Sequence, residues 1–443
     1  MSTEFVILVP HPSRRSVLTT EDGALPATSS SSLYTRDHFS AVEARLGSMP
    51  PVLRLVVGPD AQHDEFGPRL VDMDTIGPNA PAGFIWTDTD ALDLAIAAPP
   101  QLQQALRRAI GRHRDGPGPR DPPWARPAWF AMAAGWMLDR MADLGSPATG
   151  PPRVVYLWGI SMVLKAESAA GPMFLKCSAP IFGQEARVTG LLAEATPDLV
   201  TRVAAVEPEA GWLLMYDHGR QELGERAQAD WGVGLDLLAT IQRAWTARTG
   251  ELARAGAAER PLGELADNLP AFATRDVLAS QLTVEDRRAW DAAVPAFVAA
   301  CHRLDEVGPP PTLVHGDFHP WNVTDEPTGP RVFDWTDAAI SHPFTDLAVY
   351  VTRADDFALR RKMRAAYLAR WSDRMDPARL AEAGDLAIVV GTLYQVDSYL
   401  RILESLDPDD IWDLGPAIGS WARSAVATLT EGIDVVRPGH ADG

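Results

Sequence analysis

The chain contains very little cysteine. Cys177 and Cys301 are its only cysteines among 443 residues, and they fall in a predicted strand and a predicted helix. We expect both thiols to be buried and reduced, which argues against a disulfide framework and against a cysteine-based zinc site. Such cysteine usage is typical of a reducing compartment, and we therefore expect a cytoplasmic location.

Positive charge is also scarce. Lysine and arginine number 40 against 59 acidic residues, which gives a formal net charge of −19. The chain has no block of lysine and arginine with which proteins follow a phosphate backbone, so we expect no nucleic acid partner. An acidic balance could favour a cationic small molecule, but it equally keeps a chain soluble. The composition alone leaves both interpretations open.

Long apolar runs are missing as well. No stretch of about 18 residues is both apolar and uncharged, and the first ten residues lack the basic start of a secretion signal. We therefore expect no membrane partner. Hydrophobic residues nevertheless make up 46% of the chain, and tryptophan occurs 14 times. This content excludes general disorder and allows cores for roughly three domains.

Three polar residues follow two short apolar runs in the last third of the chain. The first run ends in His-Gly-Asp, whose aspartate is Asp317; Asn322 comes five residues later, and the second run precedes Asp334. The runs read as strands that bring these side chains together. Phosphoryl transfer needs a carboxylate to accept the proton of the attacking hydroxyl, and oxygen ligands for Mg²⁺. The three residues meet both needs.

This arrangement resembles the signature of the aminoglycoside phosphotransferase and choline kinase family: His-Gly-Asp, four residues, Asn, and a hydrophobic pair before Asp. The resemblance implies that Asp317 is the catalytic base and that Asn322 and Asp334 bind Mg²⁺. A protein kinase of the eukaryotic type would carry His-Arg-Asp and Asp-Phe-Gly, whereas this chain has Gly316 and Trp335 at the diagnostic places.

Three further residues around this motif are expected to support it. His315 should order the loop by bonding to the backbone. His319 could either support Asp317 or contact the acceptor. Asp346 lies in a segment that resembles the family's Asp-Leu-Ala, where the aspartate is mainly structural.

The resemblance also implies a small β-rich lobe, which residues 153–216 fit. A predicted hairpin turns at Gly159-Ile160-Ser161, where small residues let backbone amides approach phosphate oxygens. Ser161 is thus a candidate nucleotide contact, although the turn lacks a Gly-x-Gly-x-x-Gly pattern and an ordinary hairpin explains it as well.

A buried lysine is expected in the same lobe. Lys176 lies in the apolar strand 173–177, so it should have an anionic partner, and Glu185 at the start of a predicted helix, 184–195, is the candidate. In kinase-like folds such a pair holds the nucleotide phosphates. Lys165 and Glu194 are rivals for the two roles.

Residues 212–219 read as a strand and a hinge, and their position resembles the family's adenine-binding segment. Met215, Tyr216 and Asp217 are the candidate contacts there. Packing between lobes explains the first two equally well, and the segment indicates no preference between ATP and GTP.

The predicted fold class is α+β: a two-lobed protein-kinase-like fold preceded by a separate N-terminal α/β domain of unknown role. The predicted divisions are 1–114, a Pro/Gly linker at 115–127, a leading helix with the small lobe at 128–219, and a helical large lobe at 220–443. The N-terminal strands are expected at 5–9, 16–19, 52–57, 69–73 and 84–86. The large-lobe helices are expected at 229–247, 265–278, 284–307, 357–371, 377–406 and 411–429.

The N-terminal domain faintly resembles Nudix-type domains in its Val-Leu-Thr-Thr-Glu-Asp-Gly opening. That family's hydrolytic helix needs several clustered glutamates, and residues 38–46 offer only Glu43. We therefore expect a structural, dimerising or substrate-capping role. Because the predicted site lies downstream of the linker, the chain from about Ala125 onwards is expected to fold and bind nucleotide without this domain.

Two polar features of the large lobe leave alternatives open. Asp397 and Arg401 could line an acceptor pocket or form an i, i+4 ion pair. Residues 407–410, with three aspartates, could form an acidic rim for a cation or an ordinary loop with a helix cap.

These observations predict an enzyme: a small-molecule kinase that uses ATP and Mg²⁺ to phosphorylate a hydroxyl, possible acceptors being an amino sugar, an amino alcohol or an antibiotic. The alternative is an inactive kinase-like module that binds nucleotide or a protein partner. The sequence does not identify the acceptor or the oligomeric state.

Overall fold

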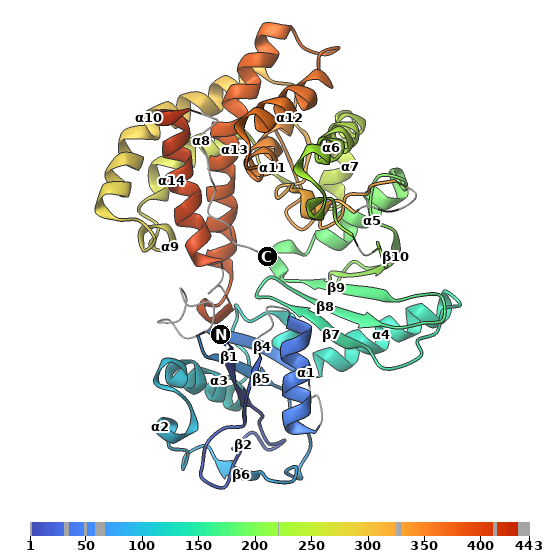
Figure 1. Ribbon diagram of the computed structural model, residues 1–443, viewed down its shortest axis with the longest axis vertical. Helices are drawn as coiled ribbons and strands as arrows, with labels where there is room; N and C mark the ends of the chain where they lie inside the picture. Colours follow the sequence, from blue (N-terminus) through green and yellow to red (C-terminus); the bar gives the residue numbers. More distant parts are fainter. Residues whose placement is uncertain are drawn as a thin grey trace. The chain divides into compact units, whose positions relative to one another are not determined.

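The computed structural model describes residues 2–30, 35–47, 51–57, 67–126, 128–219, 221–324, 326, 329–410 and 414–432. The chain forms two compact units, shown in Figure 1 with sequence-ordered colours. The first comprises Met1–Ile181 and Ser405–Asp413, and the second comprises Phe182–Glu404 and Leu414–Gly443. This division differs from the predicted one, because the N-terminal domain, the predicted linker and the first small-lobe strands share one unit.

The N-terminal part of the first unit is built on a four-stranded sheet with the order β3-β1-β5-β4. Strands β1 and β5 are parallel, whereas β3 and β4 pair antiparallel at the edges. The apolar face of helix α3 packs on this sheet through Ala105, Leu106 and Ala109, together with Leu102 directly before the helix (Figure 1). The elements are β1 (Thr3–Leu8), β2 (Ser16–Thr19), β3 (Ala27–Ser30), α1 (Thr35–Leu46), β4 (Val52–Val57), β5 (Arg69–Met73), β6 (Ile85–Asp88), α2 (Leu94–Ala97) and α3 (Gln103–Asp115).

The five predicted N-terminal strands are therefore confirmed, within one or two residues at their ends. The strand β3 and the short helix α2 were not predicted. In β3, the sequence Ala-Thr-Ser-Ser carries no apolar alternation that would mark a strand.

The predicted linker is packed rather than extended. Its residues 123–125 form a 3-10 helix, and Trp124 and Asp121 are almost fully buried in the first unit. Beyond it lie α4 (Trp129–Asp143) and an antiparallel meander of β7 (Arg153–Leu157), β8 (Ser161–Ala166) and β9 (Met173–Ser178). Gly145 follows the end of α4: its φ is +71°, and its N–H donates to the carbonyl oxygen of Ala142.

The second unit begins with α5 (Glu185–Ala195) and the hairpin of β10 (Val203–Glu207) and β11 (Trp212–Tyr216). Helices dominate the rest: α6 (Gly232–Trp245), α7 (Thr249–Arg254), α8 (Leu262–Phe272), α9 (Asp276–Ala279), α10 (Val284–Val307), α11 (Asp346–Thr352), α12 (Phe357–Ala369), α13 (Pro377–Ser405) and α14 (Gly415–Glu431). The strands β12 (Ala258–Glu259), β13 (Thr312–Val314) and β14 (Ala339–Ser341) form a small sheet.

The long helices of this unit agree closely with their patterns. The structure confirms the range predicted for α10, whose N-cap is Thr283 in a capping box with Asp286. The predicted helix 265–278 is divided into two, because α8 ends at Phe272 and α9 begins only after Arg275. Residues 411–413 of the last predicted helix lie outside the described residues. The predicted α+β fold class, with a β-rich part before a helical part, is confirmed.

One predicted strand is not formed. The apolar pair before Asp334 makes only isolated bridges, in which Val332 pairs with Val200 and Val323. The segment is too short for a ladder, since Asp334 directly after it adopts a left-handed backbone conformation.

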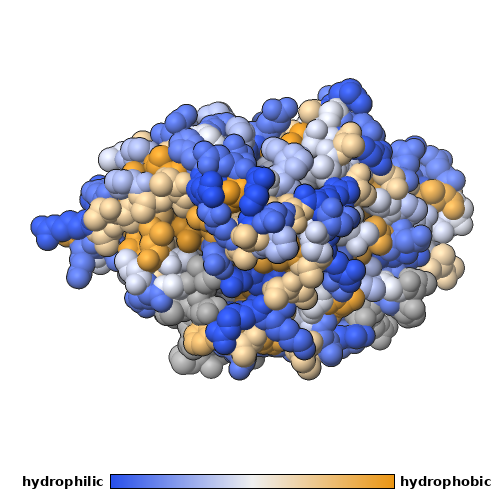
Figure 2. Space-filling model, turned by 90° about the horizontal axis from the view of Figure 1, so that it is seen from above, coloured by the Kyte–Doolittle hydropathy of each residue, from blue (hydrophilic) through white to orange (hydrophobic). Residues whose placement is uncertain are grey.

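Apolar side chains are largely enclosed. Both cysteines are buried, as predicted. Helix α13 is long and apolar enough to cross a membrane, but 83% of its most apolar window is buried inside the protein, as in a core helix. On the face that Figure 2 shows, hydrophilic residues alternate with smaller hydrophobic areas.

Candidate active site

The loop that carries the His-Gly-Asp sequence is held by Asp346 at the start of α11. The backbone N–H groups of His315 and Gly316 each donate to a different carboxylate oxygen of Asp346, both at 2.9 Å. Gln395 of α13 donates to the carbonyl oxygen of Gly316 at 2.6 Å. Burial raises the pKa of Asp346, which these amide donors partly oppose. The expected structural role of Asp346 is consistent with these bonds.

Gly316 adopts a conformation that other residues avoid. Its φ is +88°, and a Cβ atom at this position would lie 2.4 Å from the carbonyl oxygen of Asp337. Both facts require glycine here. The place where a protein kinase carries arginine has no room for any side chain.

His315 connects the two segments of the site. Its ring is fully buried, and its Nε2 lies 2.9 Å from the carbonyl oxygen of Phe333, the residue before Asp334. The backbone N–H of Phe333 in turn donates to the carbonyl oxygen of Asn322 at 3.1 Å. The segments that carry Asn322 and Asp334 therefore lie side by side, as the motif predicted, and His315 contacts the backbone as expected.

Asp317 is accessible, with 45% of its side chain exposed, and it contacts His319 and Asn322. His319 Nε2 lies 3.7 Å from Asp317 Oδ2, and the amide nitrogen of Asn322 donates to the carbonyl oxygen of Asp317 at 2.9 Å. Burial lowers the pKa of His319 to about 4, so this ring is neutral at physiological pH. The neutral imidazole therefore places no positive charge beside Asp317.

Asp334 is in a strained conformation. Its φ of +60° places a non-glycine residue in the left-handed region, which costs on the order of 1 kcal/mol. The hydroxyl of Thr336 donates to Asp334 Oδ1, and Gln184 donates to the carbonyl oxygen of Thr336 at 3.0 Å. These contacts fix Asp334 and link its segment to the residue before Glu185.

The residues present fit a magnesium ion shared with a nucleotide. Within the described ranges, no group of three His, Cys, Asp or Glu side chains could hold a metal alone. In enzymes that use nucleotides, Mg²⁺ is usually bound by one or two carboxylates together with water and substrate phosphates. Asp334 offers a carboxylate, and Asn322 uses its amide nitrogen in the loop, which leaves its oxygen for a ligand.

The structure separates the rival lysines and glutamates by burial. Lys176 on β9 and Glu185 on α5 are nearly fully buried. Lys165, by contrast, is one-third exposed and pairs with Glu167 at 2.8 Å, and Glu194 is exposed. Burial of an ionisable group needs compensation, which favours Lys176 and Glu185. They belong to the first and second unit, respectively, and their pairing stays a prediction.

The remaining candidates for nucleotide contacts are held by interactions within the fold. Ser161 is buried and opens β8. Met215 packs with Ala186 and Leu213 in a small core. The backbone N–H of Tyr216 donates to Arg202 at 3.1 Å, and Asp217 accepts from Gly219 at 3.1 Å. Their roles toward a nucleotide remain predictions.

One further residue near the site was not among the predicted contacts. His218, two residues after the end of β11, stacks on the ring of Phe333 with a centroid distance of 4.5 Å. Burial lowers its pKa. The contact joins the segment after β11 to the segment of Asp334. No spacing in the sequence indicated it, because the two residues are far apart along the chain.

The polar face of α13 has a structural explanation. Asp397 forms ion pairs with Arg260 and Arg401, each at 2.8 Å, and is almost fully buried. The i, i+4 pair is confirmed, and both groups are already engaged within the fold.

Residues 167–383 match the model of the phosphotransferase enzyme family. The matched range contains the loop of Asp317 and the segment of Asp334. The predicted resemblance to the aminoglycoside phosphotransferase family is thus confirmed over this range, and the class of activity that it supports is phosphoryl transfer to a small molecule. Among curated proteins, none matches the chain significantly.

Several solved structures are similar to the chain. A macrolide 2′-phosphotransferase from Brachybacterium faecium has 19% sequence identity and a TM-score of 0.44, with coverage of 67% of this chain and 98% of that one. A choline/ethanolamine kinase family protein from Mesorhizobium loti has 17% identity and a TM-score of 0.44, with coverage of 70% and 100%, respectively.

Proposed function

We propose that this protein is an ATP-dependent, Mg²⁺-requiring phosphotransferase that transfers the γ-phosphate to a hydroxyl group of a small molecule. The observation that carries the proposal is the pairing of an exposed Asp317 with the hydrogen-bonded segments of Asn322 and Asp334, inside the range that matches the family. These are the groups that phosphoryl transfer requires.

In this reaction Asp317 orients the acceptor hydroxyl and accepts its proton. The hydroxyl oxygen forms a bond to the γ-phosphorus while the bond from that phosphorus to the bridging oxygen breaks, and ADP leaves. The loop bonds to Asp346 and Gln395 hold Asp317 in place before substrate arrives. Positioning and charge stabilisation supply most of the catalysis in such reactions.

Asn322 and Asp334 are the proposed ligands of Mg²⁺, which would neutralise charge on the phosphates. Lys176, with Glu185, is proposed to hold the nucleotide phosphates, and Ser161 to contact them. Met215, Tyr216 and Asp217 are proposed to contact the base. Support comes from the burial of Lys176 and Glu185 and from the strained backbone of Asp334.

The competing function is a nucleotide-binding module without turnover. The presence of Asp317, Asn322 and Asp334 in the predicted arrangement favours the enzyme. The unconventional turn at Gly159 is the feature that would suit an inactive module. We propose amino sugars, amino alcohols and hydroxyl-bearing antibiotics as the acceptors to test, in a cytoplasmic setting.

The test is a panel of such acceptors incubated with MgATP and scored for phosphorylated product by mass spectrometry. Asp317→Ala should keep nucleotide binding and lose on the order of 10² to 10⁴ in turnover. Asp305→Ala, an exposed aspartate of the same unit, is the matched control and should behave as wild type. MgATP binding without any product across the panel would favour the inactive module, and wild-type turnover in Asp317→Ala would refute the assigned base.

A further inference from the structure

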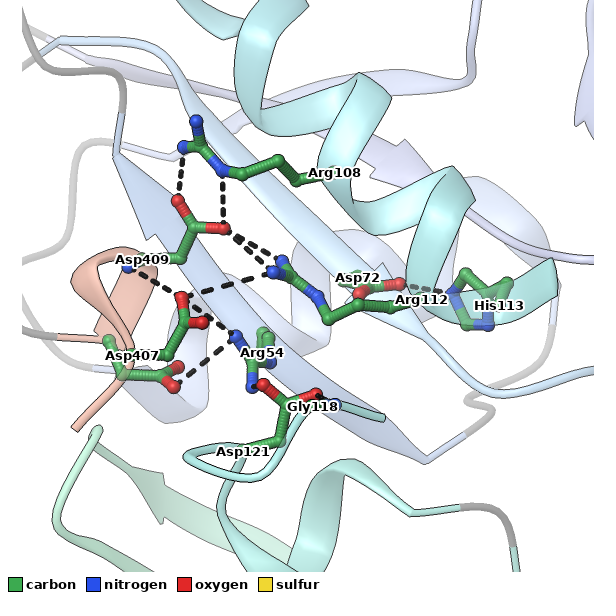
Figure 3. A network of polar contacts seen from close by, with 10 residues as sticks. Arg54, Asp72, Arg108, Arg112, His113, Gly118, Asp121, Asp407 and Asp409 are labelled. Carbon is green, nitrogen blue, oxygen red and sulfur yellow. Dashed lines mark hydrogen bonds and ion pairs between the residues drawn. The ribbon is translucent and has the colours of Figure 1, made fainter. Parts of the chain in front are cut away.

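For residues 407–410 the sequence left open an acidic rim for a cation or an ordinary loop with a helix cap. The structure favours the cap, because Asp407 accepts a hydrogen bond from the N–H of Asp409 at 3.0 Å at the start of the 3-10 helix Pro408–Asp410. Asp409 is buried and accepts hydrogen bonds from Arg108 and Arg112 of α3. Figure 3 shows both arginines reaching the carboxylate from the N-terminal domain. Asp409 is therefore already neutralised by arginines of the same unit, and the cation-rim interpretation is not supported.

Arg54 of β4 is the centre of the second half of this network. Only 1% of its side chain is exposed, and its guanidinium lies 2.5 Å from Asp121, 3.3 Å from Asp410 and 3.6 Å from Asp407. Asp121 comes from the predicted linker and accepts from the N–H of Gly118 at 2.8 Å (Figure 3). One buried arginine thus joins the N-terminal sheet, the linker and the turn at 408–410.

Asp410 also touches the candidate phosphate-binding turn. A Cβ atom added to Gly159 would lie 2.0 Å from the carbonyl oxygen of Asp410 and 2.9 Å from its Cβ. The backbone of the turn therefore rests directly on the backbone of Asp410. Gly159 has an ordinary φ, so its need for glycine here is steric rather than conformational.

Arg54 and Gly159 face the same small cavity. Its volume of about 10 Å³ corresponds to roughly one water molecule. The lining includes Leu53 and Arg54 of β4, Trp158 and Gly159 of the turn, and Asp410. Because interiors are close-packed, a shift of Asp410 in this space has to move the turn that rests on it.

We propose that Arg54 is a positioning residue for the Gly159 turn. By holding the side chain of Asp410, it fixes the backbone against which the turn rests, so that the N-terminal domain sets the geometry of nucleotide binding. The inference rests on the proposed function, in which this turn approaches the nucleotide phosphates. The N-terminal domain then contributes to the reaction by positioning the Gly159 turn, and none of its residues takes part in a chemical step.

The experiment compares Arg54→Gln with Arg108→Gln in the full-length chain. Arg108 belongs to the same network but contacts Asp409 rather than Asp410, and 40% of its side chain is exposed. Two quantities are measured: the Kd of MgATP by calorimetry, and amide hydrogen exchange of residues 158–161 in the absence of nucleotide. Arg54→Gln should weaken MgATP binding by about 2- to 30-fold, the usual range for coupling through such networks, and should speed exchange in the turn. Arg108→Gln should change neither.

A second pair of variants approaches the same contact from the turn. Gly159→Ala should push against Asp410 and weaken MgATP binding, whereas Gly150→Ala, which meets no atom within 4 Å, should not. If both act through one contact, Arg54→Gln combined with Gly159→Ala should be less than additive. This pair also provides the test if Arg54→Gln does not fold.

The outcomes separate the inference from the proposed function. If wild type binds MgATP and Arg54→Gln binds it equally well with unchanged exchange, the positioning role is refuted. Equal weakening in Arg54→Gln and Arg108→Gln would also refute it, because the effect would then be a general loss of stability. If wild type binds no MgATP, the proposed function fails, and the exchange data alone decide whether Arg54 orders the turn.

Discussion

Asp409 and Asp410 are neighbours in one short turn, yet the structure predicts opposite effects when each is replaced by asparagine. The network around them contains three arginines, at 54, 108 and 112, and four aspartates, at 121, 407, 409 and 410. One carboxylate is therefore in excess. Burial raises the pKa of Asp410 from 3.8 to about 7, against the attraction of Arg54.

The raised pKa makes the contribution of Asp410 unfavourable at high pH. The folded state holds a proton on Asp410 that the unfolded chain releases near pH 4, so stability falls as pH rises from about 4 to about 7. A shift of about 3 units at about 1.4 kcal/mol each gives a loss of about 4 kcal/mol at most. Asp410→Asn carries no such charge. We expect the unfolding free energy of Asp410→Asn to be closer to that of wild type at pH 5 than at pH 8. At pH 8 the variant should be more stable than wild type.

Asp409 should behave in the opposite way. Burial opposes its charge, but the hydrogen bond from Arg108 and the charge of Arg112 outweigh burial and lower its pKa. Its stabilisation is therefore present above about pH 4 and is lost as pH falls below that value. Asp409→Asn should lose on the order of 2 kcal/mol at pH 8, because two arginines lose a charged acceptor.

The assay is urea unfolding of wild type and both variants at pH 5 and pH 8. Urea adds no ions, so the ion pairs are not screened during the titration. The decisive quantity is the difference in unfolding free energy between each variant and wild type at pH 8. If both variants change stability in the same direction there, the excess carboxylate does not reside on Asp410 and the reasoning is wrong.

Two further predictions concern the catalytic loop. Gly316→Ala should lower the free energy of unfolding by on the order of 1–3 kcal/mol and reduce turnover, because the added Cβ would clash with Asp337. The control is Gly263→Ala, whose Cβ would enter open space on α8. Thermal unfolding and product assays compare the two variants. Asp346→Asn should cost about 1–3 kcal/mol and speed amide exchange at His315 and Gly316, because an amide offers one acceptor to two donors. Unchanged exchange in Asp346→Asn would contradict the role given to its carboxylate.

The sequence predicted best what depends on local pattern. The strands at 16–19, 52–57 and 69–73 and the helix α10 have the predicted ends, because apolar periodicity and a capping box are local signals. The approach of the segments that carry Asn322 and Asp334 was also predicted, from the apolar runs before Asp317 and Asp334, although the second run forms isolated bridges and no strand. The bonds from Asp346 and Gln395 to the loop were not, because these residues lie tens of positions away and their spacing carries no period.

The predicted boundary between the N-terminal domain and the small lobe shows where local reasoning fails. Five prolines and two glycines in residues 115–127 are typical of a flexible linker. Proline also suits a rigid packed segment, and the burial of Trp124 and the ion pair of Asp121 with Arg54 decide for packing. An arginine in the middle of a strand gives no sign of its partners when these lie on a linker and on a turn some 350 residues later.

This organisation changes what the N-terminal domain is expected to do. A domain on a flexible tether could be removed without effect on a nucleotide site that lies downstream. Here the edge strand β4 supplies Arg54, and the turn that contains Gly159 rests on the residue that Arg54 holds. Removal of residues 1–124 would take away Arg54, the cation whose attraction offsets the cost of burying the charge of Asp410. It would also expose Leu157 and the apolar lining of the small cavity. The shortened chain should therefore lose the order of the Gly159 turn, which makes the N-terminal domain a structural component of the small lobe rather than an appendage to it.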